Sequence, residues 1–248
     1  SGVVLAGADQ RVSIPNDAPN DINLVMRRSL DGGQTWEEMR TLLSLPGTGA
    51  LGASLIDSVL VQDRSTGRVI CLVDQFPGGI GQPNAVVGTG FDAQGRRMLH
   101  NRAGELFAVE LDGTVVTASG EPTDYRVILG ADATTGARAG DVLLDGEAAG
   151  SIYLAYEQAP EDCLFQHRSS HLLMITSDDE GATWSEPIDI TAQVKADWMC
   201  FLGTGPGNAI QLTGAEHAGR ILVPVYYSHE AGGTGYLSCA AIYSDDGG

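Results

Sequence analysis

The sequence predicts an all-β protein made of short strands, and three observations support this prediction. Apolar runs rich in Val, Ile, Leu or Tyr recur along the chain, and Gly, Asp, Asn or Pro bounds each run, as expected for strands. A convincing helical period is missing, and only Thr191–Trp198 is compatible with a turn or two of helix. A turn motif also follows several of the runs. The expected strands are Val3–Ala8, Ile22–Ser29, Ser58–Gln62, Arg68–Asp74, Leu106–Leu111, Tyr125–Leu129, Ser151–Glu157, His171–Ser177, Ala209–Leu212, Arg220–Tyr227 and Leu237–Ser244.

Two internal repeats indicate how these strands are grouped. Ser29–Trp36 and Ser177–Trp184 match at every fixed position of S-x-D-x-G-x-T-W, and Ser244–Gly248 begins the same pattern. A second repeat places a turn and then Gly-Arg before an apolar strand, at Gly67-Arg68 and at Gly219-Arg220. Each unit is therefore expected to contain two successive hairpins, or four antiparallel strands, which is one blade of a β-propeller.

The aspartates of the first repeat are Asp31, Asp179 and Asp246. Their carboxylates can accept hydrogen bonds from backbone N–H groups of their own turn, and the glycine of the motif can supply a positive φ. The tryptophan is expected to fold back over the edge of the blade. We therefore interpret these three aspartates as turn-forming residues and not as catalysts.

The spacing of the copies predicts an insertion. The interval between the first and second copies is more than twice the interval between the second and third, which is too long for one blade. Either a blade without the motif or a separate lobe lies between them. Residues 83–160 favour a lobe, because they are rich in Gly and Ala, contain short strands and lack both repeats. The expected division is propeller blades at 1–82, an inserted β-rich lobe at 83–160, and further blades at 161–248.

Composition narrows the classes of function. The chain has 248 residues, 43% of them apolar, which is enough to build a core. It carries 14 basic and 32 acidic residues, a formal net charge of −18, and this argues against a nucleic-acid partner because phosphates require a basic surface. No stretch approaches the roughly 20 apolar residues of a membrane span. A secretory signal is neither indicated nor excluded. Because Ser244–Gly248 opens a turn motif with no strand after it, we expect a longer protein.

Neither the cysteines nor the histidines indicate a metal site. No C-x-x-C is present, so a zinc site is not expected, and Cys71 lies in an apolar run that is typical of a buried free thiol. The four cysteines allow three disulfide pairings, and the spacing favours none of them. They are Cys71, Cys163, Cys200 and Cys239. The histidines, which show neither metal-ligand nor triad spacing, are His100, His167, His171, His217 and His229.

The repeated turn is the Asp box, and the chain resembles the sialidase (neuraminidase) family from end to end. The likeness is greatest to the large secreted bacterial type with an inserted β lobe. The resemblance implies a six-bladed β-propeller, incomplete in this chain, that acts as a secreted or cell-surface exo-α-sialidase. It also implies sialylated glycans as partners and no cofactor. The segments that carry it are Ala8–Asp17, Asp21–Ser29, Ile56–Asp63, Lys195–Gly207 and Gly219–Tyr227.

The resemblance also assigns roles to four residues. Asp17 matches the loop aspartate that protonates the leaving glycosidic oxygen and later activates water. Arg11 and Asp57 match residues that contact the region of O4 of the sugar, and Tyr226 is similar to a tyrosine that lines the pocket near the glycerol chain. In this family a tyrosine replaces the usual carboxylate nucleophile, which would be repelled by the carboxylate of the substrate.

Each of these assignments has a structural alternative. Asp17 lies in Pro15–Asn20, a segment with strong turn composition, and Asp21 competes for the catalytic role. Arg11 could pair only with acidic neighbours, and Asp57 could cap a strand end. Because consecutive residues of a strand point to opposite faces, only one of Tyr226 and its neighbour Tyr227 can face a pocket.

Some of the family's catalytic groups are missing from the sequence. The resemblance implies a clamp of three arginines for the substrate carboxylate, a nucleophilic tyrosine and a glutamate partner, and we expect all of them outside these 248 residues. We therefore expect no measurable turnover from the 248 residues alone. Two other functions stay open, namely a non-catalytic Asp-box propeller that binds glycans or protein segments, and an intramolecular trans-sialidase.

Overall fold

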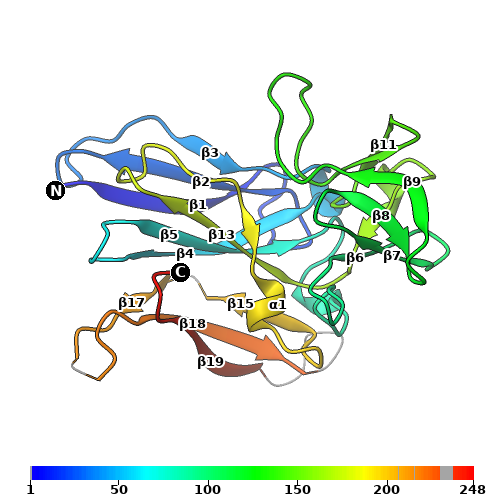
Figure 1. The fold of residues 1–248 in the computed structure, drawn as a ribbon. Coiled ribbons are helices and arrows are strands. Elements are labelled where there is room, and N and C mark those ends of the chain that lie inside the picture. The colour runs from blue at the N-terminus through cyan, green and yellow to red at the C-terminus, as the bar shows by residue number, and fades with distance from the viewer. Residues whose placement is uncertain (1, 206, 215, 230–236) are drawn as a thin grey trace.

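The strands of the computed structural model fall into three sheets (Figure 1). The structure describes residues 2–205, 207–214, 216–229 and 237–248. Pro206, which belongs to the segment Lys195–Gly207 quoted above, lies outside the described residues. In the part of the chain that is described, no helix is long and apolar enough to cross a membrane.

The first sheet has the order β1-β2-β4-β5-β13-β14, and β3 and β16 pair with β2 and β4. Most neighbours are antiparallel, but β2 and β16 run parallel to β4. The first pair is in register from Val4 opposite Ser29 to Arg11 opposite Ile22. The strands are β1 (Val4–Arg11), β2 (Ile22–Ser29), β3 (Arg40–Leu43), β4 (Ser54–Gln62), β5 (Val69–Phe76), β13 (His171–Ser177), β14 (Ile188–Asp189) and β16 (Gly207–Asn208).

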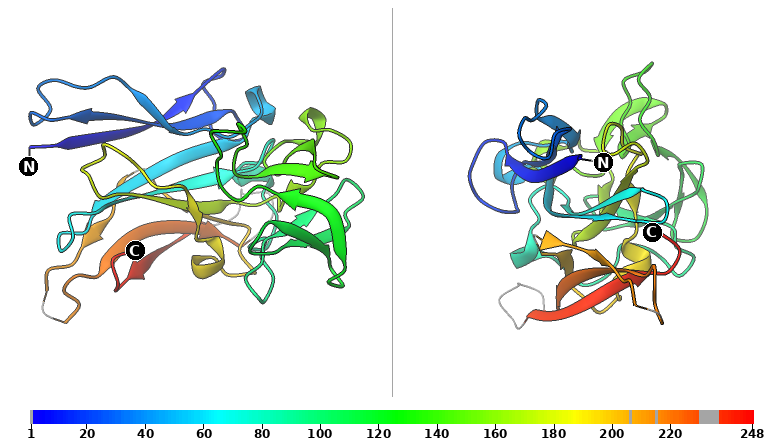
Figure 2. Two further views of the ribbon diagram at one scale, coloured as in Figure 1. Left: turned by 45° about the horizontal axis from the view of Figure 1, so that its top comes forward. Right: turned by 90° about the vertical axis from the view of Figure 1, so that its left-hand side faces the viewer.

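The second sheet follows β5 and precedes β13 in the sequence. Its order is β11-β10-β9-β8-β7-β6-β12, all antiparallel, and Figures 1 and 2 show it at one end of the long strands of the first sheet. The strands are β6 (Met98–His100), β7 (Leu106–Val109), β8 (Thr114–Thr117), β9 (Pro122–Val127), β10 (Asp141–Leu144), β11 (Glu147–Ser151) and β12 (Phe165–Gln166).

In the third sheet, β15 and β17 pair with different parts of one edge of β18, and β19 pairs along the whole of its other edge. Its strands are β15 (Phe201–Thr204), β17 (Ile210–Gln211), β18 (Ile221–Ser228) and β19 (Leu237–Ser244). Short helical turns complete the described chain. They are α1 (Thr191–Val194) and the 3₁₀ turns η1 (Gly49–Leu51), η2 (Gln82–Asn84) and η3 (Tyr156–Gln158).

The core lies between the sheets. Every residue of β5 is buried, because this strand is flanked by β4 and β13 and covered on both faces, and its continuous apolar run Val69–Val73 fits that position. One cluster of buried side chains joins β4 and β5 to β18 of the third sheet. A separate cluster fills the second sheet. The first and third sheets therefore pack against each other, and the ends of β1, β4, β5 and β18 come close together.

The all-β prediction is confirmed, and three expected strands, β2, β13 and β19, have the predicted bounds. The strand expected at Ser151–Glu157 was wrong, because β11 ends at Ser151 and a turn follows. Ile152 and Tyr153 are apolar because they fill the core of the second sheet, not because they continue a strand. Cys71, Cys163 and Cys239 are free thiols.

Candidate active site

The aspartates of the repeated turns form hydrogen bonds within their own turns. The Asp31 carboxylate accepts from the backbone N–H of Thr35 at 2.8 Å and from its hydroxyl at 2.7 Å. Asp179 accepts from the hydroxyl and the N–H of Thr183 at 2.6 and 2.8 Å, and Asp246 from the serine of its turn at 2.6 Å. The bonds from the threonines lower the pKa of Asp31 and of Asp179 to about 2. These carboxylates stay ionised and line neither of the pockets below.

The Gly-Arg repeat has a contact that the sequence reasoning missed. Arg68 forms a bidentate ion pair with Asp178, with N–O distances of 2.7 and 3.1 Å. Arg220 forms the same pair with Asp245, at 2.7 and 2.8 Å. The signal was present, since both turns read Ser-Asp-Asp and the first aspartate had no assigned partner. The two sequence repeats are therefore joined by a repeated ion pair.

A small pocket brings most of the predicted site residues together. It has a volume of about 190 Å³ and is named here the carboxylate pocket. Its lining comes from the loop after β1, from β4 and β5, from η2, and from β15 and β18. The lining residues are Asp17, Ala18, Ile56, Asp57, Asp74, Phe76, Gln82, Pro83, Phe201 and Tyr226.

The loop that carries Asp17 is held from two sides. The buried Asn20 side chain donates to the carbonyl oxygens of Ile14 and Asn16, at 2.9 and 2.8 Å. Gly81 approaches the loop so closely that a Cβ there would lie 2.2 Å from the carbonyl oxygen of Ala18. The turn composition noted in the sequence is therefore real, and it presents Asp17 at the edge of the pocket.

Asp17 forms an ion pair with Arg11, which ends β1. The side chain of Asp17 is 75% exposed and that of Arg11 is 32% exposed, so both reach a molecule at the mouth of the pocket. The hydrogen bond to Asp17 raises the pKa of Arg11. The competing Asp21 is buried beside η1, where its N–H donates to the carbonyl of Gly49 at 2.9 Å, and it does not line the pocket. The geometry therefore favours Asp17 over Asp21 as the group that meets a ligand.

Asp57 lies deeper, at an irregularity in the pairing of β4 with β5 between Ile56 and Val59. Its N–H donates to Asp9 at 3.4 Å, and the hydroxyl of Tyr226 donates to its carboxylate at 3.5 Å. Burial, followed by the charges of Asp9 and Asp17, raises the pKa of Asp57 to about 6. Asp57 can therefore exchange a proton near neutral pH or hold a hydroxyl of a ligand.

Of the two adjacent tyrosines, Tyr226 faces the carboxylate pocket. Its ring packs against Phe201 with a centroid distance of 4.8 Å. Burial and the nearby carboxylates raise the pKa of Tyr226, so its hydroxyl stays a donor. Tyr227 instead contacts Trp198 and His229 on the other side of β18. The alternation of strand side chains thus selects the tyrosine that the resemblance named.

The sequence reasoning missed Asp74 and Thr204 at the base of this pocket. Asp74 ends the apolar part of β5 and is 1% exposed. Its carboxylate accepts from the N–H of Thr204 at 2.8 Å. Burial raises the pKa of Asp74 well above its usual range, and the charge of Asp57 adds to the effect. The available signal was an acidic residue directly after the apolar run Val69–Val73.

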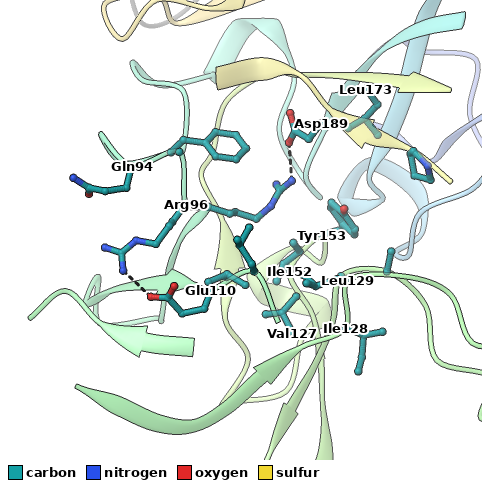
Figure 3. A pocket seen from close by; sticks show the side chains of 18 residues that line it. Gln94, Arg96, Glu110, Val127, Ile128, Leu129, Ile152, Tyr153, Leu173 and Asp189 are labelled. Atoms are coloured by element: carbon teal, nitrogen blue, oxygen red, sulfur yellow. Dashed lines mark hydrogen bonds and ion pairs between the residues drawn. The ribbon is translucent and has the colours of Figure 1, made fainter. Parts of the chain in front are cut away.

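A larger cavity of about 490 Å³, named here the junction pocket, lies between the second sheet and β13–β14 (Figure 3). Its arginines are paired with carboxylates. Arg97 contacts Asp189 at 2.8 Å, and Arg96 contacts Glu110 at 2.7 Å. Burial acts to raise the pKa of Asp189, but Arg97, His171 and Thr191 together outweigh burial, and the pKa lies below its usual range. Apolar side chains such as Val127 and Ile152 complete the wall.

Among the described residues, no group of three or more His, Cys, Asp or Glu side chains is arranged to hold a metal ion. His171 is buried beside Asp189, at 3.5 Å, and burial lowers its pKa. The carboxylate pocket therefore offers hydrogen bonds, a guanidinium and two carboxylates near its mouth, which suits binding of hydroxyl groups and proton transfer.

Comparisons with known proteins find relatives over the full length of the chain. No protein-family model matches it. The anhydrosialidase of Macrobdella decora is 31% identical over 283 aligned residues, covering 100% of this chain and 36% of that protein. The chain thus spans little more than a third of that relative's length.

Solved structures give the same result. The intramolecular trans-sialidase from Ruminococcus gnavus, in complex with oseltamivir carboxylate, matches with a TM-score of 0.81 and 27% identity, covering 100% of this chain and 56% of that one. The leech intramolecular trans-sialidase, complexed with 2,7-anhydro-Neu5Ac, matches with a TM-score of 0.80 and 26% identity, covering 100% and 40%.

Proposed function

Because this chain belongs to the sialidase family, we propose that the complete protein is an exo-α-sialidase. Its substrates would be terminal sialic acids of glycoproteins, glycolipids and oligosaccharides. One observation carries this proposal: the chain is similar to sialidases over its whole length, and Asp17, Asp57 and Tyr226 line one pocket with Arg11 at its mouth. In the junction pocket, by contrast, the carboxylates of Glu110 and Asp189 are each paired with an arginine.

In the proposed mechanism, Asp17 donates a proton to the glycosidic oxygen as the bond to the anomeric carbon breaks. A tyrosine attacks that carbon and passes its phenolic proton to a glutamate, which gives a tyrosyl-linked intermediate and, after a second displacement, retention of configuration. Asp17 then takes the proton from the attacking water. Arg11 and Asp57 would hold the O4 region of the sugar, and the Tyr226 hydroxyl would lie near the glycerol chain.

The proposal extends to the architecture. Residues 1–82 and 161–248 would supply blades of a six-bladed propeller, and residues 83–160 an inserted lobe. The lobe would contain β6 to β11 of the second sheet, and β12 from the following segment completes that sheet. The nucleophilic tyrosine, its glutamate and the three arginines that bind the substrate carboxylate would come from outside these residues. A secreted or cell-surface location would give the enzyme access to extracellular glycans.

A second candidate is an intramolecular trans-sialidase, and the two solved structures named above favour it. The first displacement is the same in both candidates. In the second, a hydroxyl of the sialyl group itself attacks the intermediate in place of water, and Asp17 takes the proton of that hydroxyl. The difference depends on whether water reaches the intermediate.

Analysis of the products tests both candidates. The complete protein is incubated with 3′-sialyllactose, and the released sugar is identified by proton NMR and mass spectrometry. Free sialic acid, appearing first as the α-anomer, supports the hydrolase, whereas 2,7-anhydro-Neu5Ac supports the intramolecular trans-sialidase. Binding of the sialoside without any product contradicts both and supports a non-catalytic binding module.

A further inference from the structure

Asp57 has a backbone conformation that few residues adopt. Its φ is 60°, in the left-handed region, and it is one of three non-glycine residues in the described chain with a positive φ. Aspartate tolerates this region better than most residues, but the conformation costs free energy unless the surroundings hold it. The surroundings of Asp57 therefore decide where its carboxylate points.

Thr204 contacts the backbone of Asp57, and Asp74 in turn contacts Thr204. The hydroxyl of Thr204 donates to the carbonyl oxygen of Asp57 at 2.5 Å. The same hydroxyl lies 3.1 Å from Oδ1 of Asp74, and the N–H of Thr204 donates to that oxygen at 2.8 Å. Thr204 is 0% exposed and Asp74 is 1% exposed, so water does not compete for these bonds.

Burial raises the pKa of Asp74 well above its usual range and so favours its neutral form. A threonine hydroxyl has one hydrogen, and the carbonyl of Asp57 can only accept, so the short bond uses that hydrogen. Oδ1 of Asp74 lies 3.1 Å from the same hydroxyl as a second, more distant acceptor, and it also accepts from the N–H of Thr204. A neutral Asp74 also explains why its Oδ2, which has no hydrogen-bond partner, can stay buried.

The neighbouring glycine leaves room for this arrangement. A Cβ at Gly203 would lie 2.0 Å from Oδ2 of Asp74 and 2.5 Å from Cζ of Phe201. Any side chain at position 203 would displace Asp74 or the aromatic wall of the pocket. The sequence Phe201-Leu-Gly-Thr204 therefore combines a wall residue, a gap for Asp74 and the hydroxyl that reaches Asp57.

We propose that Asp74 and Thr204 form a buried clamp that fixes Asp57 in its left-handed conformation and aims its carboxylate into the carboxylate pocket. Both are positioning residues, because they act through Asp57. The clamp also joins β15 of the third sheet to β4 and β5 of the first, so the pocket keeps its shape only while these sheets stay together.

The first test measures the titration of Asp57 in the full chain by carboxyl-carbon NMR. The charged and titratable groups that face Asp57 are Asp9 and Arg11 from β1, Asp17 from the loop, Asp74 from β5 and Tyr226 from β18. In the unaltered chain the pKa of Asp57 is about 6. In Thr204→Val, which removes the hydroxyl, the Asp57 carboxylate turns toward water and its pKa falls by about one unit or more toward the usual ~3.9.

Two matched variants keep the clamp. Thr204→Ser retains the hydroxyl, and Asp74→Asn retains a neutral acceptor for the Thr204 N–H, so both leave the Asp57 titration within about half a unit. Thr204→Ala removes the same hydroxyl without adding an atom, and the Asp57 titration is measured in this variant if Thr204→Val does not fold. An unchanged Asp57 titration in the folded Val or Ala variant overturns the clamp, as does a Ser variant that behaves like Val.

The second test uses the complete protein and rests on the proposed function. Thr204→Val is expected to raise KM for 3′-sialyllactose about tenfold, with kcat within about threefold, because Asp57 would hold a hydroxyl in both the bound substrate and the transition state. Thr204→Ser is expected to restore KM. A kcat loss without a KM change contradicts this role. Absence of activity in the unaltered protein contradicts the proposed function, whereas the Asp57 titration still tests whether the clamp exists.

Discussion

The carboxylate pocket and the junction pocket contain the same types of charged residue in different proportions. In the junction pocket, Arg97 pairs with Asp189 and Arg96 pairs with Asp92 and Glu110. Four aspartates lie in or beside the carboxylate pocket, and of the described residues only Arg11 forms an ion pair with any of them. They are Asp9, Asp17, Asp57 and Asp74.

This difference in balance explains the different behaviour of the carboxyl groups. The pKa of Asp189 is lowered because, despite burial, it has Arg97 beside it, whereas burial and like charges raise the pKa of Asp57 to about 6. A paired carboxylate stabilises the fold and stays ionised, but an unpaired one can hold a ligand or move a proton. The smaller pocket is therefore the better candidate for chemistry, although the other cavity is more than twice its volume.

The largest expected effect comes from removing the exposed acid of the carboxylate pocket. In the complete protein, Asp17→Ala is expected to lower kcat on 3′-sialyllactose about 10²–10⁴-fold, because protonation of the leaving oxygen is lost. An aryl sialoside with a good leaving group needs less protonation and should lose much less. Both substrates are measured under saturating conditions.

Asp21→Asn is the matched control for this experiment. Asp21 lies close to Asp17 in sequence but is buried outside the pocket, so its variant should keep kcat within about threefold. A larger loss in Asp21→Asn than in Asp17→Ala would transfer the proton-donor role to Asp21 and contradict the proposed mechanism.

The junction pocket should respond in stability. Arg97→Met leaves the nearly buried Asp189 without its cation and is expected to lower the free energy of unfolding by about 3–5 kcal/mol, measured with urea. The double variant Arg97→Met/Asp189→Leu removes both charges and should recover much of that loss. If the single variant unfolds at the same urea concentration as the unaltered chain, the Arg97–Asp189 pair does not stabilise the contact between the second sheet and β14.

A third prediction concerns pH. The raised pKa of Asp57, about 6 in the folded chain, means that the folded state binds its proton more tightly than the unfolded state, where the pKa is ~3.9. Its contribution to stability is therefore fully present below pH ~4 and is lost as the pH rises through about 6. Asp57→Asn, which also tolerates a positive φ, removes this titration.

The measurement compares the free energy of unfolding in urea at pH 4.5 and pH 7.5 for both chains. The unaltered chain should lose more stability over this interval than Asp57→Asn, and other titrating groups cancel in the comparison. Equal losses would mean that Asp57 is solvated like an ordinary aspartate. The carboxylate pocket would then shift the pKa of a carboxyl group no more than the protein surface does.

The strands and the repeated turns could be predicted from the sequence because local patterns encode them. Ile22–Ser29 and His171–Ser177 are apolar runs with turn residues at both ends, and their bounds were correct. Ser151–Glu157 has the same composition but turns inside the second sheet, because its apolar side chains fill a core that forms between distant segments. The composition of a segment therefore predicts that its apolar side chains are buried, but it does not predict the backbone conformation of that segment.

The candidate site was predictable only in part. Asp17 and Asp57 were found because their flanking residues resemble a family, whereas Asp74 and Thr204 were missed because their importance depends on contacts across 130 and 147 positions of the chain. The sequence shows neither the burial of Asp74 nor the left-handed backbone of Asp57. Both residues lie where β15 of the third sheet packs against β4 and β5 of the first.

The smallest effect is expected where an ion pair is as short as that of Arg97 with Asp189 but lies exposed on the surface. Arg68 and Asp178 form a bidentate pair, and their side chains are 44% and 67% exposed. Water and salt screen such charges, so Arg68→Gln should leave the urea unfolding curve unchanged within error, at low salt and at 1 M NaCl alike. Since Arg68 and Arg97 both contact an aspartate at close distance, a loss in Arg68→Gln as large as that in Arg97→Met would show that geometry, and not burial, determines what these pairs contribute.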